Sequence, residues 1–158
     1  MINTYLRIAV FFALTSAFLG CHEGKRPFRI VQLCLGDRQN LVQFTNILRS
    51  VAQLEGMAFI DGSDSTEQDL KAMGHKIDPA TPTINLGVER KDGMGLTAGN
   101  LGLPHYQVAL GFSEGSSTSD AKRFADMVVG KLEEHWHVEF VPDPAKAGAA
   151  PLKNCDQR

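Results

Sequence analysis

The sequence lacks any strong excess of one charge and any hydrophobic run long enough to span a membrane. Its 158 residues carry 16 Lys and Arg against 18 Asp and Glu, so there is no basic excess of the kind that drives binding to nucleic acid. Apolar residues make up 43% of the chain and charged residues 22%, proportions that exclude disordered, collagen-like and coiled-coil proteins. A chain of this length builds one compact domain with its own core and is too short for two.

The first twenty residues are typical of a targeting segment. Arg7 and the amino terminus supply positive charge, and Ile8 to Leu19 form an apolar stretch with few interruptions. A helix needs about 20 apolar residues to cross a bilayer, so this stretch is too short to span one. A signal peptide over residues 1–20 is therefore expected.

Directly after this stretch, Phe18-Leu19-Gly20-Cys21 resembles the lipobox of bacterial lipoproteins. In that family a small residue precedes a cysteine that is diacylated at its sulfur after cleavage, so the resemblance implies a lipid on Cys21. Because His22 rather than Asp follows, the sorting pattern of the family implies the outer membrane, facing the periplasm. The alternative is cleavage after Ala17, with Thr15 and Ala17 as the small pair, which would give a soluble secreted protein.

Cysteine is scarce, and the count of three is odd. If Cys21 carries lipid, Cys34 and Cys155 remain as one pair that can form a disulfide in an oxidising periplasm. This bridge would join the end of the chain to its first strand. The alternative is that Cys34 is a small buried apolar residue and Cys155 a free thiol on a tail.

Two long helices are predicted from their caps and their apolar spacing. Asp37 is expected to cap the first, whose apolar positions recur at three- and four-residue spacing until Gly56 ends it. Ser117, with Asp120 three residues later, predicts the start of the second. A shorter helix is expected from the capping-box pattern of Ser65 and Gln68.

Strands are predicted where apolar residues alternate with polar or small ones. These segments are residues 28–35, 57–60, 83–89, 106–112 and 135–140. The third and fourth segments are expected to form a hairpin.

The resulting order predicts an α+β fold, close to a ferredoxin-like plan. We expect a mixed or antiparallel sheet of four to five strands with the two main helices on one face. The other face would carry Gly87, Ala109 and Gly111, which are small enough for a tail or a partner to lie against. The mature chain then divides into a tether over residues 21–27, one domain over 28–142 and a tail over 143–158.

Gly111-Phe112-Ser113-Glu114-Gly115 matches the GxSxG pattern of serine hydrolases. In such an enzyme Ser113 would be the nucleophile, and His135 or His137 would be its base. The expected helix starts too late for a nucleophile elbow, and no histidine follows Asp143. A Gly/Ser loop before a helix cap is the alternative interpretation.

His135, His137 and Glu139 would project from one face of a strand and offer three metal-capable side chains. A closed zinc or copper site needs a further ligand. Polar side chains on a solvent-facing strand explain the same pattern, so no metal and no other cofactor is expected.

The segment from Asp92 to Pro104 is predicted to be a long loop with four glycines. Its first part, residues 93–98, fits the GxGxxG/A dinucleotide pattern, but a strand rather than a helix is expected to follow. Four apolar side chains on this loop would either fold back over the core or bind a partner. They are Met94, Leu96, Leu101 and Leu103.

These observations favour a membrane-tethered lipoprotein with a non-enzymatic protein-binding domain, of the envelope-adaptor or the inhibitor and immunity type. Its partner would be another envelope or secreted protein, bound through the loop at residues 92–104 and the neighbouring sheet. The alternatives are a periplasmic serine hydrolase and a metal-binding protein.

Overall fold

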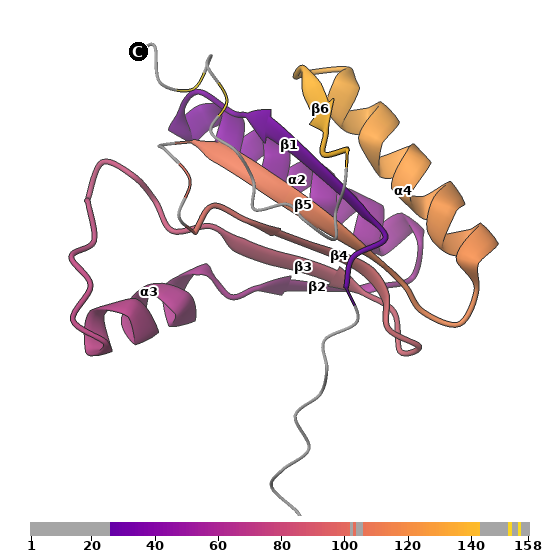
Figure 1. Ribbon diagram of the computed structural model, residues 1–158, viewed down its shortest axis with the longest axis horizontal. Coiled ribbons are helices and arrows are strands. Elements are labelled where there is room, and N and C mark those ends of the chain that lie inside the picture. Colours follow the sequence, from indigo (N-terminus) through magenta and orange to yellow (C-terminus); the bar gives the residue numbers. More distant parts are fainter. Residues whose placement is uncertain (1–25, 102, 104–105, 143–151, 153–154, 156–158) are drawn as a thin grey trace, which may run out of the picture.

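A computed structural model describes residues 26–101, 103, 106–142, 152 and 155 of the chain (Figure 1). The segment predicted to be a signal peptide, the stretch that resembles a lipobox and Cys21 lie outside the described residues. Within the described part, no helix is long and apolar enough to cross a membrane. In chain order the elements are β1 (Arg29–Cys34), α2 (Arg38–Leu54), β2 (Ala58–Asp61), α3 (Ser63–Ala72), β3 (Asn85–Glu89), β4 (Met94–Gly99), β5 (Gln107–Glu114), α4 (Thr118–Glu133) and β6 (Val138–Phe140).

The six strands form one antiparallel sheet in the order β2-β3-β4-β5-β1-β6. The α+β class is confirmed, but the expected count of four to five strands was too low. The strand that was missed is β4, which lies between β3 and β5. Leu96 of β4 pairs with Val88 on one side and with Phe112 on the other, so β3 and β5 are not the two strands of one hairpin.

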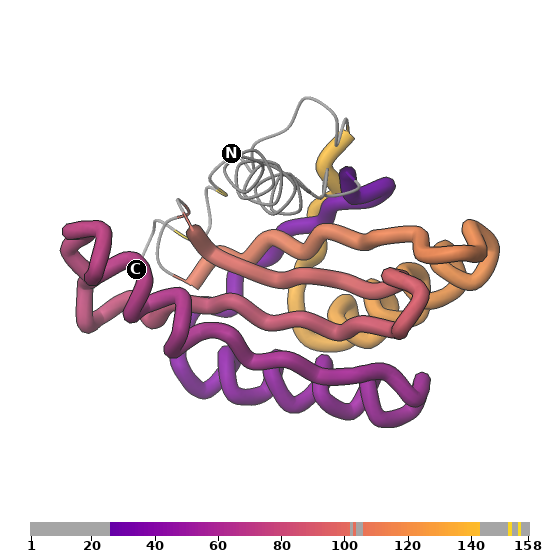
Figure 2. The backbone as a smooth tube through the Cα atoms, turned by 90° about the horizontal axis from the view of Figure 1, so that it is seen from below, coloured from indigo at the N-terminus to yellow at the C-terminus, as the bar shows by residue number. Residues whose placement is uncertain are grey.

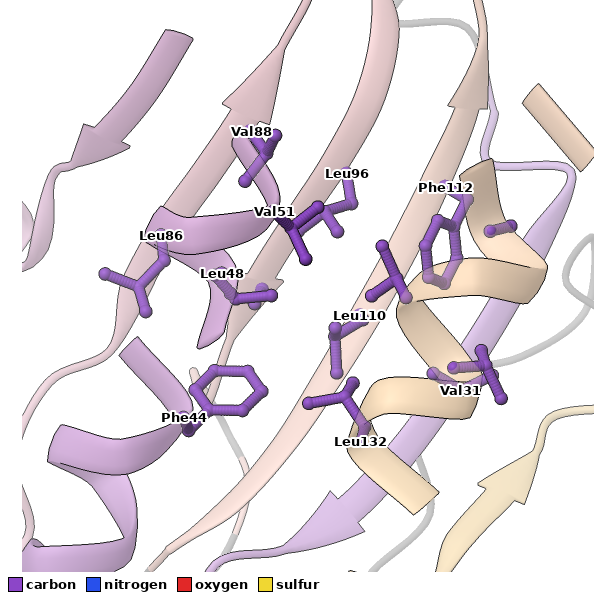
Figure 3. Close-up of a cluster of buried hydrophobic side chains, with 14 of the residues drawn as sticks. Val31, Phe44, Leu48, Val51, Leu86, Val88, Leu96, Leu110, Phe112 and Leu132 are labelled. Atoms are coloured by element: carbon purple, nitrogen blue, oxygen red, sulfur yellow. The ribbon is translucent and has the colours of Figure 1, made fainter. Parts of the chain in front are cut away.

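The hydrophobic core lies between the sheet and the helices α2 and α4, which cover the same face (Figure 2). Alternation along each strand turns every second side chain toward the helices. Figure 3 shows side chains of this core, among them Val31, Phe44, Leu48, Val51, Leu86, Val88, Leu96, Leu110, Phe112 and Leu132.

Both long helices begin at the expected caps. The Asp37 side chain accepts a hydrogen bond from the Asn40 N–H at the start of α2, and the Ser117 side chain accepts one from the Asp120 N–H at the start of α4. The predicted start of the short helix was wrong. Helix α3 begins at Ser63 with no side-chain cap, and Ser65 lies inside it, where its hydroxyl donates to the carbonyl of Gly62 at 2.9 Å.

The last strand is shorter than the alternation predicted. The N–H of His135 and that of Trp136 both donate to the carbonyl of Leu132, so the chain is still turning at these residues and β6 starts only at Val138. The Trp136 ring packs edge-on against Phe44, with 6.1 Å between the ring centroids. This packing against the first helix is long-range, and the local alternation does not reveal it.

The face of the sheet away from α2 and α4 carries the disulfide between Cys34 and Cys155, whose Cα atoms are 5.5 Å apart. Near it, the Leu152 N–H donates to Gln107 Oε1 at 2.8 Å, and Gln107 Nε2 donates to Gln32 Oε1 at 3.2 Å. Leu152 and Cys155 are both buried. The predicted disulfide is therefore present, and the tail contacts the face where the sequence analysis expected a tail or a partner.

Candidate functional site

The antiparallel strands give the molecule two distinct ends. The first is the tether end, where the described chain enters at residues 26–28 and the Phe28 N–H donates to the carbonyl of Phe112 at 2.9 Å. Strand β1 runs from there to Cys34. The strand register places the end of β2 and the start of β3 toward the Cys34 end. The connection between β2 and β3, residues 62–84, therefore extends from the opposite end of the sheet, and we call this connection the arm (Figure 1).

Helix α3 is the main element of the arm, and none of its residues is buried. The arm is fixed at its root by Asn85. The Asn85 N–H donates to the Ser63 hydroxyl at 3.1 Å, its side-chain amide donates to the Thr66 hydroxyl at 2.7 Å, and its carbonyl accepts from the Gly62 N–H at 2.8 Å. Helix α3 is thus held in place by polar contacts at the end of the sheet rather than by packing in the core.

The returning part of the arm is tied to the connection between β4 and β5 by Asn100. This side chain is 6% exposed; its amide nitrogen donates to the carbonyl of Pro82 and its oxygen accepts from the Ile84 N–H, each at 2.8 Å. The next residue, Leu101, is 60% exposed. Asn100 therefore places an exposed leucine beside the arm.

A cleft of about 460 Å³ lies between the arm and the body of the domain. Its lining includes Arg38 at the start of α2 and Tyr106 just before β5, together with Asp64 and Glu67 of α3. Residues 77–83 of the returning chain complete it. The cleft combines charged groups of both signs with one aromatic ring, and it opens at the same end of the molecule as Leu101.

Two of the four predicted partner-binding residues are in the core. Met94 and Leu96 belong to β4 and are 0% and 3% exposed, so their assignment to a loop was wrong, while their burial agrees with the alternative that they lie against the core. Gly93, at a φ of 84°, allows the tight turn that returns the chain directly into this strand. Leu101 and Leu103 do lie in a connection, and Leu103 is half-buried.

Ser113 lies within β5, not on a turn between a strand and a helix. Its hydroxyl donates to the carbonyl of Gly93 at 2.8 Å. His137 directly precedes β6, at the end of β1 where Cys34 pairs with Gln107. Gln107 and Ser113 are six residue steps apart along β5, which corresponds to about 20 Å of strand. The structure does not bring Ser113 and His137 together.

The three predicted metal-capable residues also do not converge. His135 is next to α2, where Gln43 lies 3.1 Å from its ring nitrogen Nδ1. His137 and Glu139 are near each other on the opposite side, with 3.8 Å between nitrogen and carboxylate oxygen. Among the described residues, no group of three or more His, Cys, Asp and Glu side chains is arranged to hold a metal ion.

Among the described residues, Asp92 has the most strongly shifted pKa. It lies in the turn between β3 and β4 at the tether end. The Arg90 guanidinium donates to both of its carboxylate oxygens, at 2.8 and 2.7 Å, and Ser116 donates to it through its hydroxyl and its N–H. These bonds, led by the one from Arg90, hold the pKa of Asp92 well below its usual range. The cluster joins the turn between β3 and β4 to the turn before α4, which is a structural role.

The arm and the two asparagines that fix it were not predicted from the sequence. The available signal was the absence of an apolar stripe between Ser63 and Ala72, since a helix that packs on a core shows one. No protein-family model matches the chain, and no curated protein matches its sequence significantly.

Proposed function

We propose that this protein is a lipoprotein, anchored through a lipid on Cys21, whose non-enzymatic domain binds another envelope or secreted protein. The partner would bind at the end of the sheet from which the arm extends, which we call the arm end. The binding surface would consist of the arm, the cleft beside it and Leu101. The earlier expectation of binding through residues 92–104 is thereby narrowed to the part of that segment that follows β4.

Export to an oxidising compartment is supported by the cysteine pairing. Disulfides persist in secreted and periplasmic proteins and are rare in the cytosol. The bond between Cys34 and Cys155 also leaves Cys21 as the one cysteine of three that is available for acylation. One cysteine outside the disulfide, at the position where a lipobox has its acylated cysteine, thus agrees with the resemblance to a lipobox.

The observation that carries the binding proposal is that α3 is held in place without burying a residue. Ordering a residue costs about 1 to 2 kcal/mol of conformational entropy, and a ten-residue helix is marginal in water by itself. The polar contacts of Asn85 and Asn100 keep the arm beside the body although the arm adds little to the core. A segment ordered in this way is suited to present a surface to a partner.

The side chains at this end fit a protein partner better than a small ligand. Met73, at the end of α3, is 67% exposed, and Leu101 is 60% exposed. Exposed apolar side chains at the same end of the molecule as a charged cleft resemble the mixture of apolar centre and polar rim in protein interfaces. Small-molecule sites are more enclosed and more apolar than this cleft.

The test is site-specific photo-crosslinking in living cells. A photoreactive phenylalanine analogue at Met73 or Leu101 should give a discrete crosslinked product that depends on the partner, and the same probe at Val42, which is 56% exposed on α2, should not. Capture of the partner should weaken in Leu101→Ser and stay unchanged in Val42→Ser. Equal crosslinking at all three positions, or none at any of them, would remove the arm end from the proposal.

A further inference from the structure

At the tether end Arg29 lies against the exposed ring of Phe140. Arg26 lies three residues before Arg29 in the chain, and we call Arg26, Arg29 and Phe140 the patch. The Arg29 guanidinium lies 5.9 Å from the centre of the Phe28 ring and 5.9 Å from that of the Phe140 ring. Phe140 is 54% exposed on the edge strand β6. Arg26 is exposed where the described chain begins.

The position of this patch relative to the proposed anchor follows from chain length. Seven residue steps separate Cys21 from Phe28, and an extended chain covers at most about 3.6 Å per step. Phe28 must therefore lie within about 25 Å of a lipid-bearing Cys21. Because β6 runs back to the same end, with the Val141 N–H donating to the carbonyl of Ile30, Phe140 is subject to nearly the same limit.

The side chains of the patch suit the boundary between lipid and water. Aromatic rings are enriched at that boundary, and arginine can place its aliphatic part among apolar groups while its charge contacts headgroup phosphates. The Arg29 side chain is 25% exposed and forms an ion pair with Asp126 of α4, so it is the exposed part of its guanidinium that can donate to a headgroup phosphate. Arg26 adds a second positive charge.

We propose that the patch of Arg26, Arg29 and Phe140 rests on the phospholipid surface and sets the orientation of the domain, with the arm pointing away from the membrane. This inference depends on the proposed lipid anchor at Cys21. The occupant is the bilayer to which the chain itself is tethered. The eight residues of β5 alone correspond to about 26 Å, so the arm would be held well clear of the headgroups.

The experiment uses the full lipidated chain reconstituted into vesicles of phosphatidylethanolamine and phosphatidylglycerol. A polarity-sensitive fluorophore is attached at Pro142→Cys, next to the patch, and in a second variant at Met73→Cys on the arm. Both positions are exposed. Acylation of Cys21 and the disulfide of the other two cysteines leave the new thiol as the labelling site.

The Pro142 probe should shift its emission to the blue on reconstitution and be quenched by nitroxide-labelled lipids, whereas the Met73 probe should do neither. Adding Phe140→Ser should reduce quenching at Pro142, with the far-ultraviolet circular dichroism unchanged. Vesicle-bound protein with equal, weak quenching at both positions would overturn the patch while leaving the anchor intact. Protein that does not associate with the vesicles would overturn the anchor, and with it this inference.

Discussion

Removing the disulfide tests the export proposal and the fold together. Replacing Cys155 by Ser opens a bridge between residues that are 121 positions apart. In the chain-entropy description, a closed loop of this size destabilises the unfolded state by about 5 kcal/mol. That value is the largest expected loss of stability in the variant.

The measured loss should be smaller, because the tail can leave the body once the bridge is gone. Burial of Leu152 contributes about 2 kcal/mol, and its hydrogen bond to Gln107 about 1 kcal/mol. Ordering the chain at Leu152 and Cys155 offsets this sum, at about 1 to 2 kcal/mol for each ordered residue. We therefore expect a loss of about 2 to 4 kcal/mol, with the body still folded and the tail open to proteases.

Urea unfolding of the wild type, of Cys34→Ser, of Cys155→Ser and of the double variant provides the measurement. The three variants should share one midpoint, because each removes the same bond, and reductant should move the wild type to that midpoint. Alkylation of the wild type should modify Cys34 and Cys155 only after reduction. Additive losses in the double variant, or a wild type that reductant does not affect, would refute the reasoning.

Three further predictions concern single residues. Asn100→Ala should destabilise the protein by about 2 to 3 kcal/mol in urea unfolding, because it leaves the buried Ile84 N–H and the carbonyl of Pro82 without this partner; a loss below about 0.5 kcal/mol would contradict this. Gly115→Ala should be destabilising, because the φ of Gly115 is 64° and an added Cβ would lie 2.6 Å from the backbone nitrogen of Met94. Gly130→Ala in α4, where an added Cβ would have nothing within 4 Å, should instead stabilise the protein by about 0.5 to 1 kcal/mol. A change of the same sign in the unfolding free energy of both variants would contradict this prediction. The pKa of Asp92 is lower in the folded state, so the contribution of this carboxylate to stability should be complete above the unfolded pKa of about 3.9 and be lost as the pH falls below it. Asp92→Asn should therefore lose less stability than the wild type between about pH 5 and pH 2. Parallel curves of stability against pH for the two proteins would argue against the cluster.

The helices could be predicted because their signals are local. Asp37 and Ser117 each cap a helix within three residues of their own position, and such contacts leave a pattern in a short window of sequence. The predicted start of α3 was wrong for a related reason. Ser65 and Gln68 have the spacing of a capping box, but the chain already turns at Gly62, where the backbone is fixed by Asn85 from far along the sequence.

The site was less predictable, because its position depends on contacts that bring together distant parts of the chain. Asn85 and Asn100 are ordinary polar residues in the sequence, and each becomes important only through partners more than ten positions away. Leu101 was selected correctly as part of a connection. Met94 and Leu96 were not, although together with Ala98 they alternate as expected of a strand; the glycines at positions 93, 95 and 99 obscured this pattern.

The strand β4, which was not predicted, also determines at which end of the molecule the predicted binding segment lies. In an up-and-down sheet each strand moves the chain from one end to the other. If β3 were joined directly to β5, all of residues 90–106 would form one connection at the tether end, close to the proposed lipid anchor. With β4 present, the turn at Asp92 stays at the tether end, and Leu101 moves to the arm end. The six residues of β4 thus move the proposed binding loop from the end beside the proposed anchor to the opposite end of the molecule, where a partner would approach without meeting the bilayer.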